Sequence, residues 1–346
     1  MIRVQHSHWP VEAITHPGMS GKNNEDRFGV SAYQMPDKAA TPVLLAVLSD
    51  GIGGHRGGEV AAELAVTEIS QALAAAQSNG QEPLADLKFA IQQASERIYQ
   101  QAGSSPALQG MGATVACAWI FGNRLYTATV GDSRIYLCRA GQILQLSTDH
   151  TWIQEAIERG LLRPEQARGH PNAHVIRRFL GGPTPPEVDF RLRLAADEDD
   201  ALQLAHQGLV LQPGDRVLLC SDGLTDLVPA DEILAVLRQA ESLRTALETL
   251  VALANQRGGH DNITAVLVQV VSLPSPWGAL WRRLRWGCLG LLLAGLLSLM
   301  ILIGLGLWQW RNSTSSVSPT HTVTVTPIST PMLPSVTPVL PRRPLP

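Results

Sequence analysis

Five short acidic motifs are spread along the chain, and they restrict how it can fold. They are Asn24-Glu25-Asp26, Ser49-Asp50-Gly51, Gly131-Asp132-Ser133, Ser221-Asp222-Gly223 and His260-Asp261-Asn262. Two of them directly follow apolar runs, at residues 43–48 and 217–220, which are typical of buried strands. A carboxylate at the end of a buried strand is costly unless it meets a cation. The motifs therefore favour a fold in which several strand ends converge on one place.

The composition allows a sizeable core and excludes some classes of protein. The chain has 346 residues, of which 45% are hydrophobic, and its formal net charge of −3 gives no sign of a nucleic-acid-binding surface. The four cysteines are Cys117, Cys138, Cys220 and Cys288. Their wide spacing indicates neither a zinc site nor a disulfide framework, so we expect reduced, buried side chains.

The pattern of apolar residues predicts one mixed domain over residues 1–273. Strands are expected at 41–49, 114–121, 124–130, 135–139, 143–146, 215–220 and 263–271. Helices are expected at 59–77, from Pro83 onwards, and at 152–160, 231–239 and 243–256. The turns after 121 and 139 are short enough to impose antiparallel pairing. Antiparallel strands with helices grouped in pairs predict two packed sheets that are covered by helices on the outside.

The C-terminal part of the chain differs from the rest. Residues 287–307 carry no charge, and this stretch meets the ~20 residues that a helix needs to cross a bilayer. We therefore expect a basic, Trp-containing linker at 274–286, a transmembrane helix at 287–308 and a disordered Pro/Ser/Thr-rich tail at 309–346. A buried core helix is the alternative for the apolar stretch. Arginines are more frequent just before it than just after it, which places the first domain in the cytoplasm and the tail outside.

The acidic motifs predict a metal site if they meet. Asp50, Asp222 and Asp261 could then hold two divalent cations about 4 Å apart. An all-oxygen ligand set suits magnesium or manganese. A water that bridges two such ions becomes a nucleophile at neutral pH, so no Ser, Cys or His nucleophile is needed. Taken singly, each motif is more simply read as a turn or as solvated surface.

Taken together, the motifs and their order resemble those of the metal-dependent serine/threonine protein phosphatases of type 2C, also called PPM, in their bacterial form. The matching segments are Asn23-Asn24-Glu25-Asp26, Ser49-Asp50-Gly51-Ile52-Gly53-Gly54-His55, Gly57-Gly58-Glu59, Gly131-Asp132-Ser133-Arg134, Thr148-Asp149-His150-Thr151, Ser221-Asp222-Gly223-Leu224-Thr225-Asp226 and Gly259-His260-Asp261-Asn262. The resemblance covers residues 16–271. It implies an α+β fold, a four-layer α-β-β-α sandwich with two central antiparallel sheets.

The resemblance also implies roles for individual residues. Asp50 would bridge two catalytic cations, Mn²⁺ or Mg²⁺, and the Gly51 carbonyl would bind one of them. Asp222 and Asp261 would complete this site, Asp26 would act through metal-bound waters, and Asp132 would help to hold a third, weaker cation. Residues 151–186 match a flap beside the active site. Arg134 is expected in a structural ion pair, and His150 as a hydrogen-bonding loop residue.

Two positions depart from the family pattern. Where the family usually has an Arg that grips the substrate phosphate, this chain has Gly21, with Lys22 beside it. Lys22 is therefore the expected substrate-binding residue, although a lysine lacks the bidentate fork of arginine. Where some members have a His that can act as a general acid, this chain has Ile52, so no protein general acid is assigned.

These features predict a membrane-anchored enzyme that hydrolyses phosphoserine and phosphothreonine on cytoplasmic proteins. Its expected partners are those phosphorylated proteins, an opposing serine/threonine kinase and the cell membrane, with no nucleic acid. The alternative is a signalling module that binds phosphoproteins with low activity, and the missing arginine favours it.

Overall fold

The computed structural model describes residues 1–37, 39–52, 57–76, 81–167, 170–195, 197–272 and 276–313, but not the side chains of residue 164 and residues 276–294. Residues 53–55, the end of the family-matching segment Ser49–His55, and the expected tail from 314 onwards lie outside this set. The chain divides into two compact units, Met1–Ser275 and Pro276–Pro346.

Two antiparallel sheets form the centre of the first unit. In order across the first sheet, the strands are β1 (Ile2–Arg3), β3 (Arg27–Gln34), β4 (Pro42–Ser49), β7 (Val115–Phe121), β8 (Arg124–Val130) and β11 (Leu209–Val210). The second sheet has the order β10 (Gln142–Gln145), β9 (Arg134–Arg139), β12 (Arg216–Cys220), β13 (Ile263–Gln269) and β2 (Val11–His16). A short ladder pairs β5 (Gly51–Ile52) with β6 (Gly112–Ala113).

The continuous apolar run of β4 follows from its burial on both faces. Successive side chains of a strand point to opposite faces. Val43, Leu45 and Val47 belong to the core under the first pair of helices, whereas Leu44 and Leu48 belong to the core between the two sheets. A strand at this position therefore needs apolar residues at every place and shows no alternation.

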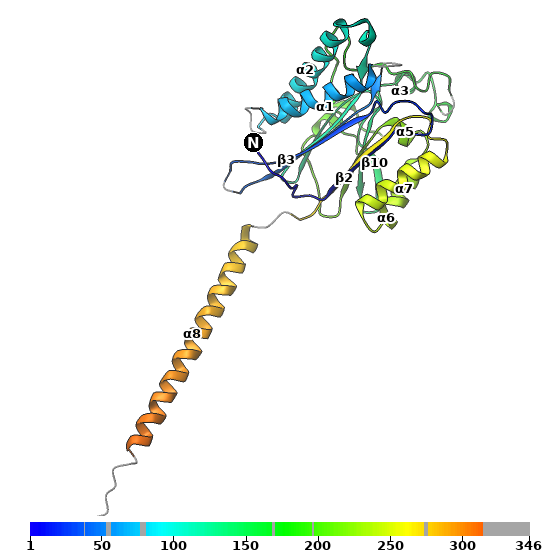
Figure 1. Ribbon diagram of the computed structural model, residues 1–346. Coiled ribbons are helices and arrows are strands. Elements are labelled where there is room, and N and C mark those ends of the chain that lie inside the picture. The colour runs from blue at the N-terminus through cyan, green and yellow to red at the C-terminus, as the bar shows by residue number, and fades with distance from the viewer. Residues whose placement is uncertain are drawn as a thin grey trace, which may run out of the picture. The chain divides into compact units, whose positions relative to one another are not determined.

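Helices cover both outer faces of the paired sheets. The helices of the first unit are α1 (Gly58–Ala74), α2 (Pro83–Gly103), α3 (Trp152–Glu158), α4 (Asp200–Ala205), α5 (Asp222–Thr225), α6 (Ala230–Gln239) and α7 (Leu243–Gln256). The first two pack on the first sheet, and α6 and α7 pack on the second (Figure 1). One core lies between the sheets and one lies under each helix pair. The expected α-β-β-α sandwich with two antiparallel sheets is confirmed.

Most expected elements lie where the sequence placed them, within a few residues at their ends. Two full-length strands, β2 and β3, were not predicted. Almost all of their residues are only partly buried, so neither strand carries the continuous apolar run that marks β4.

The acidic residues 197–200 lie at the start of α4. The Asp199 side chain accepts a hydrogen bond from the Leu202 backbone N–H and caps this helix.

Among the described residues of the second unit, Pro276–Ser313 form the helix α8. The transmembrane helix expected at residues 287–308 is not confirmed. Within the described portion of the chain, no helix combines the length and the apolar character that crossing a membrane requires.

Cys117, Cys138 and Cys220 are buried and form no disulfide, as expected. Burial raises the pKa of each thiol, to about 11 for Cys138 and about 12 for Cys220, and well above its usual range for Cys117. These three cysteines lie inside the sheets as small apolar side chains.

Candidate active site

The fold brings the five acidic motifs to one end of both sheets. In the first sheet, Arg27 pairs with Ser49 across β3 and β4. Asp26 immediately precedes the first of these strands and Asp50 immediately follows the second. Antiparallel pairing therefore places two carboxylates side by side, although 24 positions separate them in the sequence.

The second sheet contributes in the same way. Cys220, the last residue of β12, pairs with Ala265 of β13 and with Arg134 of β9. Asp222 follows β12, and Asp261 precedes β13. Asp132 lies in the short connection from β8 of the first sheet to β9 of the second. The strand ends that carry the acidic motifs thus converge, as the sequence predicted.

The carboxylates repel one another, and burial adds to the cost of their charge. The pKa of Asp26 is raised from 3.8 to about 7, first by burial and then by the charges of Asp222 and Asp261. The pKa of Asp222 is raised to about 6, mainly by burial and by Asp226 and Asp261. Burial and the neighbouring carboxylates also raise the pKa values of Asp50 and Asp132 well above their usual range.

Three of these carboxylates carry an oxygen that is buried and has no hydrogen-bond partner among the described residues: Asp26 Oδ1, Asp132 Oδ1 and Asp222 Oδ1. Buried polar atoms in native proteins are almost always satisfied. A cluster of carboxylate oxygens without donors is the ligand set that a hard divalent cation prefers. The residues at this end of the sheets therefore fit a divalent-cation site.

Neutral side chains next to the carboxylates hold them in place. The Ser221 hydroxyl donates to Asp26 Oδ2 at 2.7 Å and accepts from the Thr264 backbone N–H at 3.0 Å. It thus joins the first sheet to the second at the site. The Asn262 side chain accepts from the Glu25 backbone N–H at 2.7 Å and donates to the Pro17 carbonyl. Ser221 and Asn262 both belong to the acidic motifs, but no role was predicted for their side chains.

A second set of polar contacts fixes the loops around Asp50 and Asp132. Thr114 Oγ1 accepts from the Asp50 backbone N–H at 3.0 Å and lies 2.8 Å from Ser133 Oγ. Arg134 forms an ion pair with Asp149 at 2.7 Å, which confirms its expected structural role. His150 accepts from the Gly131 backbone and pairs with Asp189 at 3.0 Å, as expected of a loop residue.

Two glycines let the backbone approach the site closely. A Cβ atom on Gly58, the first residue of α1, would lie 2.6 Å from Glu25 Oε2 and 2.8 Å from the Gly51 carbonyl oxygen. A Cβ atom on Gly51 would in turn clash with the Gly58 backbone. The close approach of these two backbones therefore requires glycine at both positions.

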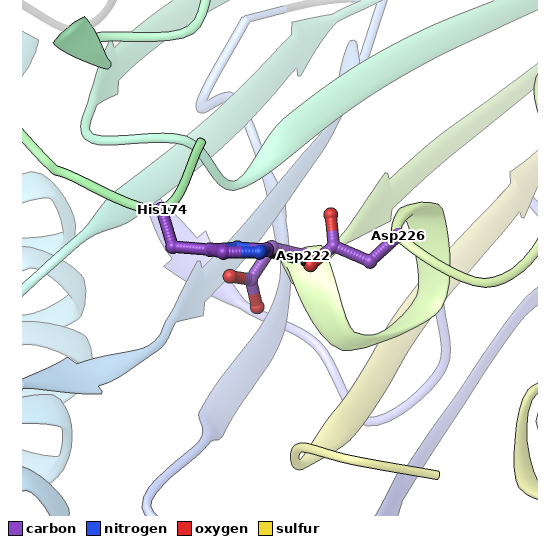
Figure 2. A group of neighbouring side chains, drawn as sticks. All are labelled: His174, Asp222 and Asp226. Atoms are coloured by element: carbon purple, nitrogen blue, oxygen red, sulfur yellow. Dashed lines mark ion pairs between the residues drawn. The ribbon is translucent and has the colours of Figure 1, made fainter. Parts of the chain in front are cut away.

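The structure adds one flap residue to the site. His174 Nδ1 lies 3.3 Å from Asp226 Oδ2. These two residues and Asp222 place potential ligand atoms within 4.8 Å of one another (Figure 2). This contact could not be predicted from the sequence, because 48 positions separate His174 from Asp222 and no spacing rule links them.

Lys22 lies at the edge of the site, with its Nζ 3.9 Å from Asp261 Oδ2, and both side chains are more than half exposed. The backbone of Gly21 has a φ of +73°, and no atom lies within 4 Å of the position that its Cβ would occupy. An arginine at this position would have room for its Cβ atom but would require a strained backbone.

Comparisons with known proteins agree with this arrangement. Residues 18–268 match the family model described as protein phosphatase 2C. The chain is 34% identical over 261 residues to a serine/threonine phosphatase of Listeria welshimeri, covering 75% of this chain and 95% of that protein.

Solved structures show the same likeness. The serine/threonine phosphatase of S. agalactiae superposes with a TM-score of 0.65 at 32% identity, over 76% of this chain and all of that one. The catalytic domain of the phosphatase PstP in complex with two manganese ions gives a TM-score of 0.60 at 32% identity, over 76% of this chain and 99% of that one. The chain therefore belongs to the protein phosphatase 2C family and is an enzyme of the serine/threonine phosphatase class.

Proposed function

We propose that this enzyme hydrolyses phosphoserine and phosphothreonine on proteins with the help of two divalent cations, manganese or magnesium. Asp50, Asp222, Asp261 and the Gly51 carbonyl would hold them, with Asp26 acting through waters and Asp132 helping to hold a third cation. The observation that carries the proposal is a set of buried carboxylate oxygens for which the described residues supply no hydrogen-bond partner: Asp26 Oδ1, Asp132 Oδ1 and Asp222 Oδ1. The manganese-bound relative supports the choice of metal.

When bound, the cations would supply a water of lowered pKa and would offset the negative charge of the phosphate. The residues of the chain position these groups. Ser221 and Thr114 orient Asp26 and the Asp50 backbone. Lys22 places a positive charge next to Asp261, where it can attract the phosphate of the substrate. No serine, cysteine or histidine is assigned as a nucleophile.

Phosphate release from a phosphothreonine peptide by the full chain tests this proposal, with and without manganese. We expect metal-dependent release that falls roughly a hundredfold or more in Asp222→Asn, because this variant lacks one of the charges that hold the cations. Asp231→Asn, an exposed position in the first turn of α6, is the matched control and should keep full activity. A folded chain without release in any metal would overturn the proposal.

The second candidate is a phosphoprotein-binding module with little turnover. Its support is the glycine at position 21, which offers no side chain to a phosphate. Isothermal titration with a phosphopeptide distinguishes the two functions. Binding that is as tight in Asp222→Asn as in the natural chain, together with no release, would favour the module.

The partners and the location of the chain stay predictions. The opposing kinase rests on the family resemblance, and attachment to the cell membrane rests on the uncharged sequence 287–307. Alkaline carbonate extraction of membranes from cells that express the full chain tests the latter. Retention in the membrane pellet is the expected result, and complete release into the supernatant would contradict it.

A further inference from the structure

A groove of about 510 Å³ lies between the end of α2 and the last part of the flap. Its lining includes Tyr99, Met111, Phe179 and Pro183. The rings of Tyr99 and Phe179 are 44% and 41% exposed. Aromatic rings that remain half exposed on either side of a groove are typical of surfaces that bind another chain.

The groove is connected to the metal end of the sheets through the backbone. The Phe179 ring of its lining packs against Gly112, where a Cβ would lie 2.8 Å from Phe179 Cδ2. Gly112 in turn pairs with Ile52, the neighbour of Gly51, in the short β5–β6 ladder. Neighbouring strands lie about 5 Å apart, so the groove begins within roughly 10 Å of the Gly51 carbonyl. An extended peptide advances about 3.4 Å per residue. A substrate with its phosphorylated residue at the site would therefore reach the groove two to four residues away.

The walls of the groove are fixed before any ligand binds. Leu180 and Ala113 exchange backbone hydrogen bonds of 2.8 and 3.1 Å. The Gly181 backbone N–H donates to Ser95 Oγ of α2 at 3.0 Å. Gly181 has a φ of +96°, and a Cβ there would lie 2.6 Å from Ile98 Cγ2. Because these contacts pin the end of the flap to α2, binding in the groove costs little ordering of the protein.

We propose that this groove binds an apolar side chain of the substrate polypeptide, two to four residues from the phosphorylated serine or threonine. The occupant follows from the lining, which is mainly aromatic and apolar, and from the continuity of the groove with the site. Glu96 on the rim disfavours an acidic residue at the same place on the peptide. This inference rests on the proposed phosphatase function and adds a sequence preference to it.

The test is a set of phosphothreonine peptides that differ only in the position of one leucine in a Gly/Ser background, from four residues before to four residues after the phosphothreonine. kcat/KM of the full chain with manganese is measured for each peptide. We expect an increase of roughly tenfold, mainly through KM, at an offset of two to four residues on one side. The increase should disappear in Tyr99→Ala and in Phe179→Ala.

Two controls make the result specific. Phe89→Ala removes an aromatic ring that is 64% exposed on the same helix but does not line the groove, and it should keep the preference. p-Nitrophenyl phosphate carries no polypeptide, so all variants should hydrolyse it at the rate of the natural chain.

Other outcomes would contradict the proposal that the groove binds a substrate side chain. Hydrolysis of all peptides at one rate, or a preference that survives Tyr99→Ala, would overturn the inference and leave the proposed function standing. A change of oligomeric state in Tyr99→Ala without a change in preference would show a self-association surface instead. Absence of release from every substrate would overturn the proposed function and this inference with it.

Discussion

Asp26 combines nearly complete burial, a hydrogen bond from Ser221 and an oxygen, Oδ1, that has no hydrogen-bond partner in the part of the chain that the structure describes. Each property has a different effect on its charge. The Ser221 hydroxyl stabilises the carboxylate form, whereas burial and the neighbouring carboxylates favour the protonated form and dominate the pKa. At the scale of single residues, the site is therefore built for a bound cation and is unfavourable without one.

Asp26→Asn should stabilise the chain when divalent metal has been removed with EDTA. The pKa of Asp26 is about 7 in the folded chain and ordinarily 3.8, so the folded state binds more protons than the unfolded state between these values. The contribution of Asp26 to stability therefore falls as pH rises from about 4 to about 7. The Asp26→Asn variant carries a neutral amide and lacks this dependence. In EDTA at pH 8 we expect its melting temperature to be several degrees higher than that of the natural chain.

Thermal unfolding at pH 5 and pH 8 measures this effect, with Asp231→Asn as the control that should follow the natural chain. With manganese present, the order at pH 8 should reverse, because the natural chain gains cation binding. A melting temperature for Asp26→Asn at or below that of the natural chain in EDTA would contradict the assigned cause.

Lys22→Ala should raise KM for a phosphopeptide several-fold and leave kcat within about twofold, because an exposed charge contributes modestly to binding. The increase should shrink as ionic strength rises. Lys88→Ala, which removes an exposed lysine from α2, is the matched control. Unchanged kinetic parameters in Lys22→Ala would exclude this residue as the phosphate contact.

At the scale of elements, the start of α1 and the flap both pack on the site through close contacts. These contacts leave little room for a different side chain. Gly58 places the first turn of α1 against Gly51. His174 joins the flap to Asp226, just after α5. Elements from distant parts of the chain thus meet at the carboxylates, so their packing controls the geometry of the site.

Gly58→Ala should lower both metal affinity and stability, although alanine favours a helix. The added methyl group would lie 2.6 Å from Glu25 Oε2, and overpacking of this kind costs about 1–3 kcal/mol. Gly103→Ala, at the end of α2, has open space at the equivalent position and should not destabilise the chain. Manganese titration and thermal unfolding measure the two effects, and equal behaviour of both variants would contradict the steric explanation.

His174→Ala should loosen the flap. Without the pair to Asp226, we expect faster hydrogen exchange at flap amides such as that of Trp152, which donates to the Val175 carbonyl. His206→Ala removes a comparable contact, 3.0 Å to Glu198, outside the candidate site, and should leave flap exchange unchanged. Identical exchange in the His174 variant and the natural chain would show that this pair does not hold the flap.

The sequence predicted the elements whose burial is complete and the residues whose role is local. β4, β7 and β12 were found because uninterrupted apolar runs mark them. β2 and β3 were missed because partial exposure leaves them without such a pattern. Likewise, Asp26 and Asp50 were found from motifs, but the Ser221–Asp26 hydrogen bond and the His174–Asp226 pair join residues 195 and 52 positions apart. Contacts of this kind depend on the packing of the two sheets, which no local pattern records.

At the scale of the whole molecule, Met1–Ser275 contains all three cores and the entire candidate site. The groove beside the site also lies within this unit. We therefore expect residues 1–275 to be sufficient for phosphate release.

A chain that ends at Ser275 should keep the melting temperature within about 2 °C and the kcat/KM for a soluble phosphopeptide within about twofold, because the cores and the candidate site lie within Met1–Ser275. Calorimetry and phosphate release on the shortened and full chains measure this. A large loss in either quantity would show that residues 276–346 contribute to the phosphatase unit.

The three cysteines inside the sheets have a practical consequence. Only the thiolate reacts with maleimides or iodoacetamide. Burial raises the pKa of Cys117, Cys138 and Cys220 and shields them from reagents, so their thiols stay protonated and unreactive. Modification of these three should therefore require unfolding. In a Cys288→Ser background, a single cysteine introduced on the flap would carry a fluorophore at one known place, and its emission would follow the flap during turnover.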